Sequence, residues 1–140
     1  MPLVAGVAKV TNTQAEVGTH AITAEYMGDA VSSTSTSPVL HEVVNRASTT
    51  TVLTSSANPS KSGQIVTFTA TATSSTGRDP FGTVTFAGGG TTLGTVAVSD
   101  TKASISTAAL PLGSTSITAT YSGAAGFTGS SDSLMQVVQP

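Results

Sequence analysis

Apolar and hydroxyl-bearing residues alternate at period two along the C-terminal two thirds of the chain. In residues 64–73, Val66, Phe68, Ala70 and Ala72 occupy every second position, and threonine fills the positions between them. This alternation is typical of a β-strand with one buried and one exposed face. Apolar residues nowhere recur at intervals of three and four over a helical length. The pattern therefore predicts an all-β protein.

Seven short segments after residue 48 have this strand character, with turn residues between them. The predicted strands are residues 49–56, 64–73, 82–87, 92–98, 102–107, 114–121 and 133–139. The turn signals include Asn58-Pro59, Gly88-Gly89-Gly90 and Ser122-Gly123. Together they predict an antiparallel β-sandwich. The predicted core comprises Val52, Val66, Phe68, Ala70, Val84, Phe86, Leu93, Val96, Val98, Ile105, Leu110, Ile117, Ala119, Tyr121, Leu134 and Val138.

An internal repeat divides the chain. Residues 17–30 (VGTHAITAEYMGDA) resemble residues 112–125 (LGSTSITATYSGAA), 95 positions later, and the match continues with one deleted residue to the C-terminal strand. A period of this length is that of a small domain, not of a solenoid repeat. We therefore predict that residues 1–45 are the second half of a module with its last three strands, that residues 46–48 are a linker, and that residues 49–140 are a complete module.

The half-module lacks the first strands of a sandwich, so its apolar face has no predicted cover. An uncovered apolar face and an open strand edge are pairing sites. The interface candidates are Val10, Ile22, Ala24, Tyr26, Leu40 and Val44. The half-module is interpreted either as a piece of a longer tandem array, or as a surface that pairs with a second copy or accepts strands from a neighbouring subunit.

Composition and charge exclude several classes of function. Five Lys and Arg against seven Asp and Glu give a net charge of -2, and no basic cluster exists for nucleic acid. Cysteine and tryptophan are absent, while Ser and Thr make up about a third of the chain. No apolar run approaches the length of a membrane span, and residues 1–6 lack the basic flank of a signal peptide.

The landmarks of the second module resemble the bacterial immunoglobulin-like (Ig-like) repeats that occur in tandem in large secreted and surface proteins. The resemblance rests on these segments, in the family's order and spacing: TTTVLT at 49–54, Asn58-Pro59, VTFTA at 66–70, GTVTF at 82–86, Leu93-Gly94, Ala109-Leu110 and ITATYSG at 117–123. It implies an Ig-like sandwich, an extracellular or cell-surface location, and a non-enzymatic stalk or adhesion module without a cofactor. Implied partners are neighbouring modules, other copies of the chain, or a cell-surface ligand or glycan.

Few residues offer site chemistry. His20 and His41 both fall in the half-module and are interpreted as solvent-facing strand positions, because Thr115 and Met135 replace them in the second copy. Asp29 is a weak candidate calcium ligand, since acidic residues are scattered singly and no acidic ligand spacing occurs.

Three functions are compatible with the sequence. The first is a stalk or spacer module of a surface or secreted protein. The second is a self-assembling filament subunit that uses the half-module for dimerisation or strand exchange. The third is a carbohydrate-binding or phage-associated decoration domain, for which Phe81 and Phe127 are the surface-binding candidates, although Phe127 is expected first of all to cap one end of the sandwich.

Overall fold

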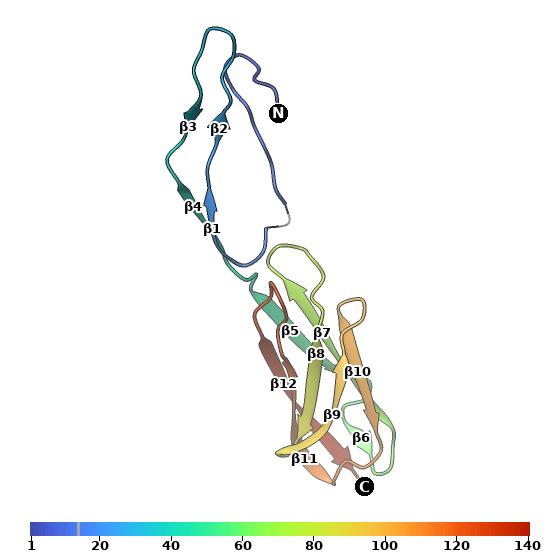
Figure 1. The fold of residues 1–140 in the computed structure, drawn as a ribbon. Helices are drawn as coiled ribbons and strands as arrows, with labels where there is room; N and C mark the ends of the chain where they lie inside the picture. The colour runs from blue at the N-terminus through green and yellow to red at the C-terminus, as the bar shows by residue number, and fades with distance from the viewer. Residues whose placement is uncertain (14) are drawn as a thin grey trace. The chain divides into compact units, whose positions relative to one another are not determined.

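The computed structural model describes residues 1–13 and 15–140 and contains β-strands as its regular elements (Figure 1). The predicted all-β class is confirmed. The chain forms two compact units, Met1–Asn45 (unit 1) and Arg46–Pro140 (unit 2). Within the described residues, no helix is long and apolar enough to cross a membrane.

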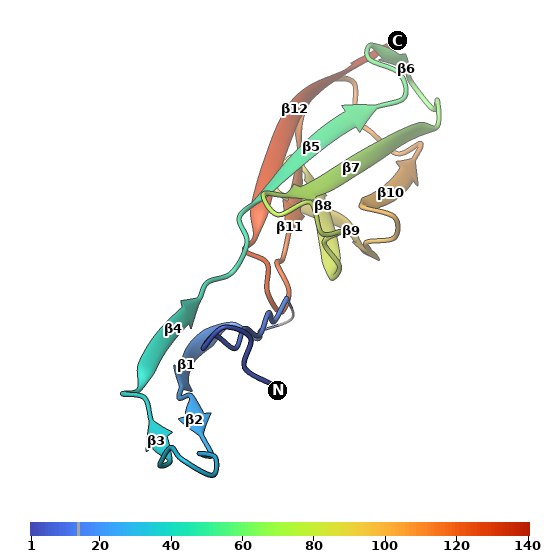
Figure 2. The same cartoon turned by 90° about the horizontal axis from the view of Figure 1, so that it is seen from above.

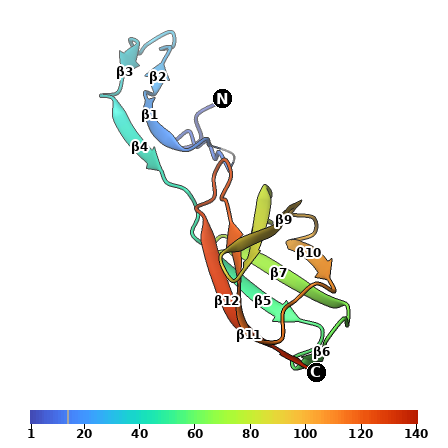
Figure 3. The same ribbon diagram turned by 90° about the horizontal axis from the view of Figure 1, so that it is seen from below.

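Unit 2 is a sandwich of two antiparallel sheets. Its strands are β5 (Thr49–Ser55), β6 (Ser60–Lys61), β7 (Val66–Ser74), β8 (Thr83–Gly88), β9 (Thr91–Ala97), β10 (Lys102–Thr107), β11 (Gly113–Tyr121) and β12 (Ser130–Gln139). One sheet has the order β10-β7-β5 and the other has the order β6-β12-β11-β8-β9. Figures 2 and 3 show β5 beside β7, and β11 beside β12, from two further directions. Only β6 joins its neighbour, β12, in parallel.

The triple glycine at 88–90 forms the predicted hairpin turn. Gly88 pairs with Thr91, and Gly89 and Gly90 adopt φ values of 57° and 84° between them. Two consecutive positive φ angles are the geometry of a two-residue type I′ turn, which glycine adopts without steric penalty. This turn places β9 beside β8, in the five-stranded sheet.

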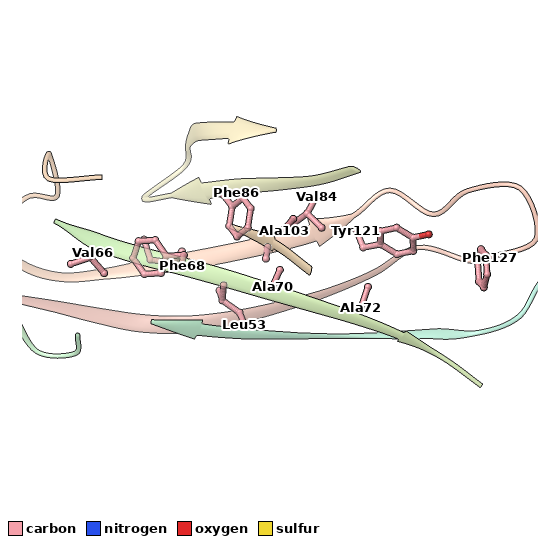
Figure 4. Packing of buried hydrophobic residues seen from close by; sticks show 12 residues of the cluster. Leu53, Val66, Phe68, Ala70, Ala72, Val84, Phe86, Ala103, Tyr121 and Phe127 are labelled. Carbon is pink, nitrogen blue, oxygen red and sulfur yellow. The ribbon is translucent and has the colours of Figure 1, made fainter. Parts of the chain in front are cut away.

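The core lies between the two sheets (Figure 4). The alternate apolar residues of β7 are fully buried, as their spacing predicts, and face Val84 and Phe86 of β8. Tyr121 and Phe127 fill the end of the sandwich where β11 leads into the β11–β12 loop. Burial of Val, Leu or Phe contributes about 1.5–3 kcal/mol per side chain, so this small core supports a domain of ordinary stability.

One predicted core residue lies on the wrong face. Val52 is 51% exposed, whereas its neighbours Thr51 and Leu53 are buried. Thr51 faces inward because its hydroxyl bonds Ser130 of β12. In a strand the faces alternate, so the inward position of Thr51 also turns Leu53 inward and Val52 outward.

Unit 1 contains two short antiparallel ladders. Strand β1 (Gly18–Ile22) pairs with β4 (Leu40–Val44), and β2 (Glu25–Tyr26) pairs with β3 (Ser35–Thr36). Between the ladders, residues 23–24 face residues 37–39, so one strand carries an extra residue. This is a β-bulge, and Pro38, which has no N–H to donate, sits within it.

The structure corrects the expectation of three strands in residues 1–45. The first of the three, ahead of β1, does not form: residues 8–13 have no strand, and Val4 and Val7 make only an isolated bridge. The matching strand of unit 2, β10, forms its ladder with β7. Among the described residues of unit 1, no strand equivalent to β7 is present.

Candidate functional site

The first and last strands of unit 2 meet along one side of the sandwich, although they belong to different sheets. Side chains join them in a row, which we call the terminal-strand seam. Its members on the first strand and the loop after it are Thr49, Thr51, Leu53, Ser55, Ala57, Asn58 and Ser60; on the last strand and the residues before it they are Thr128, Ser130, Asp132, Met135, Gln136 and Val137.

Hydroxyl groups and one carboxylate form the first part of the seam. The Thr49 hydroxyl donates to the carbonyl of Thr128 at 2.8 Å. The Ser130 hydroxyl lies 2.8 Å from that of Thr49 and 2.7 Å from that of Thr51. Further along, the Leu53 N–H donates to Oδ2 of Asp132 at 2.8 Å. A carboxylate that accepts a backbone N–H makes a charge-assisted bond, which is stronger than a neutral one.

Gln136 forms the centre of the second part, and its side chain is fully buried. Its Oε1 accepts a hydrogen bond from Ser55 at 2.7 Å, and its Nε2 donates to the carbonyl of Ala57 at 2.7 Å and to Ser60 Oγ at 3.2 Å. Among the described residues, every buried polar side-chain atom has a partner. Gln136 is therefore a satisfied polar clamp, which is how buried amides are tolerated.

The last part of the seam passes into the parallel ladder. Nδ2 of Asn58 donates to the carbonyl of Met135 at 2.7 Å, and the N–H of Val137 donates to Oδ1 of Asn58 at 3.0 Å. The side-chain amide thus takes the place of a backbone neighbour of β12. Immediately after it, β6 pairs with Val138 and Gln139.

The two strands of the seam run in the same direction. The start of β5 meets the start of β12, at Thr49 and Ser130, and Ser55 near its end meets Gln136. The chain therefore enters unit 2 at the end that carries the β11–β12 loop and leaves at the opposite end, beside β6 (Figure 1). When the two ends are pulled apart, the contacts of the seam are loaded together in shear.

The entry end of unit 2 is fixed by the β11–β12 loop. The N–H of Ala47 donates to the carbonyl of Gly126 at 2.8 Å, and the N–H of Thr128 donates to the carbonyl of Ala47 at 2.9 Å. Tyr121 donates its hydroxyl to the carbonyl of Phe81 at 2.5 Å. Burial raises the pKa of the Tyr121 hydroxyl above its ordinary value.

The two phenylalanine candidates have different environments. Phe127 is only 2% exposed and contacts the ring of Phe81 edge to face, at 5.7 Å between centroids. Arg78 lies over the Phe127 ring at 5.9 Å, within the range of a cation–π contact. Phe127 is thus a capping residue, and the interpretation of it as a surface-binding residue is corrected. Phe81, 51% exposed, keeps an accessible ring.

The six interface candidates of unit 1 carry exposed surface. Val10, Ile22, Ala24 and Leu40 are exposed, and Tyr26 and Val44 are half-buried. These residues do not gather into a core of their own. That they form an interface stays a prediction.

Asp29 closes a loop in unit 1. Its Oδ1 accepts the N–H groups of Val31 and Ser32, at 2.9 and 2.7 Å, and its Oδ2 accepts the Tyr26 hydroxyl at 2.9 Å. The bond from Val31, then those from Tyr26 and Ser32, lower the pKa of Asp29 below its ordinary value. Both carboxylate oxygens thus have partners within the loop, which assigns Asp29 a structural role.

Metal chemistry finds no support in the part of the chain that the structure describes. No group of three His, Cys, Asp or Glu side chains gathers there. The register pairs His20 with Glu42 and Ala21 with His41. Adjacent register positions point to opposite faces, so the two histidines do not converge. A surface hollow of about 330 Å³ near Leu93 and Leu110 has no titratable side chain in its lining.

The seam was not predicted from the sequence. The signal that was available lies in residues 130–136, where Ser130, Asp132 and Gln136 put polar groups at inward positions of a strand. Only their partners across the sandwich show why these groups are there.

The comparison with known protein families agrees with the sandwich. The sequence model of the bacterial Ig-like domain (group 3) matches residues 53–139, which is more than half of the chain. Among solved structures, the fibronectin(III)-like modules of Clostridium thermocellum CbhA align with 89% of this chain and 64% of that chain, at 20% identity and a TM-score of 0.49. The chain thus spans less than two thirds of that relative's length. No curated protein matches the sequence. The family match and the two-sheet architecture together show that the chain belongs to the bacterial Ig-like domain family, group 3.

Proposed function

We propose that this protein is a structural module of a bacterial surface or secreted protein, non-enzymatic, whose unit 2 is a stalk segment that carries tension between its two ends. The observation that carries the proposal is the seam between the parallel first and last strands. The seam lies between the points where the chain enters and leaves the domain.

Shear loading supports this role physically. Contacts loaded together must break nearly at once, whereas a ladder pulled from one end opens one bond at a time. Forced unfolding is governed by the unfolding rate, so contacts that break in the transition state matter more than total stability. The family match adds support, since an Ig-like domain is typically a structural or adhesive module.

Single-molecule pulling on the full chain, through handles at its two ends, tests the proposal. Gln136→Leu removes the polar clamp of the seam, and Val84→Ala removes two methyl groups from the core at a fully buried position away from it. Their expected equilibrium losses are similar, about 2–4 kcal/mol for the first and about 1.5–3 kcal/mol for the second. We expect Gln136→Leu to lower the unfolding force clearly more. Equal force losses in the two variants would contradict the proposal that the seam carries the tension.

Self-assembly through unit 1 is a second candidate, favoured by the exposure of its apolar strand residues. Ile22 and Leu40, which are register partners, are 47% and 61% exposed. Light scattering of the full chain over a hundredfold range of concentration tests this. A mass that rises with concentration, and that falls back to the monomer in the double variant Ile22→Ser with Leu40→Ser, is the expected result for self-assembly.

Binding of a glycan is a third candidate, now resting on the exposed ring of Phe81 alone. If Phe81→Ala leaves glycan-array binding unchanged, this candidate loses its structural basis.

A further inference from the structure

The β1–β4 ladder of unit 1 has the same register as the corresponding part of the β11–β12 hairpin of unit 2, and the β2–β3 ladder, beyond the bulge, again pairs the matching tyrosine with a serine. In both hairpins a glycine pairs with a valine, an isoleucine with a leucine, and a tyrosine with a serine. The corresponding pairs are Gly18↔Val44 and Gly113↔Val138, Ile22↔Leu40 and Ile117↔Leu134, and Tyr26↔Ser35 and Tyr121↔Ser130. The second hairpin therefore indicates what a hairpin of this pattern contacts inside a complete sandwich.

In unit 2, the hairpin's neighbours come from the first half of the module. β8 pairs antiparallel along β11, from Ile117↔Gly88 to Tyr121↔Val84. β6 pairs in parallel with the end of β12, and β5 joins β12 through the seam. These three strands all lie between residues 49 and 88.

The matching side chains differ in burial because the described part of unit 1 has no such neighbours. Ile22 is 47% exposed, whereas Ile117 is fully buried. Ala24 is exposed, whereas Ala119 is fully buried. The tyrosines differ in the same way: Tyr121 donates to a carbonyl of the first half, whereas Tyr26 donates to Asp29 in its own loop.

We propose that the hairpin of unit 1 is a docking surface for the first half of an Ig-like repeat, the strand set equivalent to β5–β9, carried by another module of the same family. This inference rests on the proposed structural function and adds a partner to it. By analogy with unit 2, the partner adds a strand antiparallel to residues 22–26, which include the end of β1 and all of β2, and a short strand parallel to the end of β4. Its alternate apolar residues cover Ile22 and Ala24. Main-chain bonds at a free strand edge supply affinity, and alternate side chains supply specificity.

One position sets the chemistry that the partner must offer. Glu42 pairs with His20, as Gln136 pairs with Thr115, so Glu42 occupies the place of the buried clamp. An ionised carboxylate accepts hydrogen bonds but donates none, so it can take hydroxyl donors but cannot donate to a carbonyl as Gln136 donates to Ala57. The partner suited to Glu42 therefore presents hydroxyl or N–H donors there, and Glu42→Gln fits a first half of the unit 2 type better.

The test joins a second copy of residues 48–95 directly ahead of Met1 of the full chain. The 95-residue offset of the repeat makes Met1 the natural successor of residue 95, so the added strands reach the hairpin in register. Hydrogen exchange of the β1, β2 and β4 amides is measured with and without the added copy, because protection reports local opening. We expect these amides to exchange at least a hundredfold more slowly in the extended chain than in the original chain. Glu42→Gln should slow their exchange further in the extended chain and should leave their exchange rates in the original chain unchanged.

The control carries Val84→Asp and Phe86→Asp within the added copy only, and should leave β1, β2 and β4 exchanging as in the original chain. A second readout uses Tyr121→Phe, which leaves Tyr26 as the one tyrosine, since residues 48–95 contain none. Its emission should become less accessible to a neutral quencher such as acrylamide only in the extended chain with the unmodified copy.

Two results would overturn the proposal. One is that the exchange rates of the β1, β2 and β4 amides, and the quenching of Tyr26, are the same in the extended chain as in the control chain. The other is full protection of these strands in the original chain at high concentration with a doubled mass, which would assign the surface to a second copy. Neither result affects the force measurement on Gln136→Leu, so the stalk proposal stands or falls separately.

Discussion

Replacing Gln136 by leucine is the sharpest test of the seam. The change keeps side-chain bulk at a fully buried position but removes four hydrogen bonds, to Ser55, the carbonyl of Ala57, Ser60 and the carbonyl of Val137. Each such bond contributes about 0.5–1.5 kcal/mol net. The carbonyl of Ala57 keeps the Ser55 hydroxyl, at 3.2 Å, as its remaining donor. We expect the free energy of unfolding to fall by about 2–4 kcal/mol, out of a total of about 5–15 kcal/mol for a domain of this class.

Urea unfolding followed by tyrosine fluorescence measures this loss. In a Tyr26→Phe background, Tyr121, which is buried in the core of unit 2, is the reporting group. With an m-value of about 1–1.5 kcal/mol/M, the midpoint should fall by about 1.3–4 M. Met135→Leu, at an adjacent and 56% exposed position of β12, is the matched control and should change stability by less than about 0.5 kcal/mol. A midpoint for Gln136→Leu within the range of the control would refute the view that this amide holds the terminal strands together.

Three further predictions concern loops. Gly123→Ala should lower the free energy of unfolding by about 1–3 kcal/mol, which is more than Gly126→Ala in the same loop. Both glycines have positive φ, but only at Gly123 would an added Cβ meet backbone, at 2.9 Å from the nitrogen of Gly129. Urea unfolding midpoints of the two variants test this difference. Phe127→Ala should lower the free energy of unfolding by about 3–5 kcal/mol, because the ring is buried, whereas Phe81→Ala should lower it by about 1 kcal/mol through the lost ring contact. Similar losses in the two variants would contradict the capping role of Phe127. Because the pKa of Asp29 is lowered in the folded state, the stabilisation from its loop contacts is fully present above the unfolded-state pKa and is lost as the pH falls through the folded-state pKa. In an NMR pH titration, the amide signals of Val31 and Ser32 should shift together with the Asp29 carboxyl signal. Amide shifts that are independent of this carboxyl would contradict the loop geometry.

The period-two pattern located most strands of unit 2 because their burial is governed by one apolar face. The predicted strand 102–107 has the same bounds as β10 in the structure. The predicted strand 64–73 differs from β7 by two residues at its start and one at its end. The small core around Phe68 and Phe86 follows directly from alternation.

The features that the pattern did not predict depend on polar contacts between distant segments. β6 has two residues and no periodicity, and it exists because β12 offers it a parallel edge. The outward position of Val52 follows from the inward hydroxyl of Thr51, a choice that apolar alternation does not reveal. The strand predicted ahead of β1 does not form, although its residues alternate in the same way as those of β10. In unit 2, β10 pairs with β7, and the described residues of unit 1 contain no strand equivalent to β7.

The first segment of unit 2 crosses from one sheet to the other, since β5 belongs to the three-stranded sheet and β6 to the five-stranded sheet. One continuous stretch of backbone is thus shared by both layers, and neither layer can separate from the other while that stretch stays bound. Partial opening in which one sheet detaches intact is therefore disfavoured, and the amides of both sheets should exchange through the same global event. A protease that needs an extended substrate then finds the strands of unit 2 only in the fully unfolded chain, at a frequency set by the whole stability of the domain.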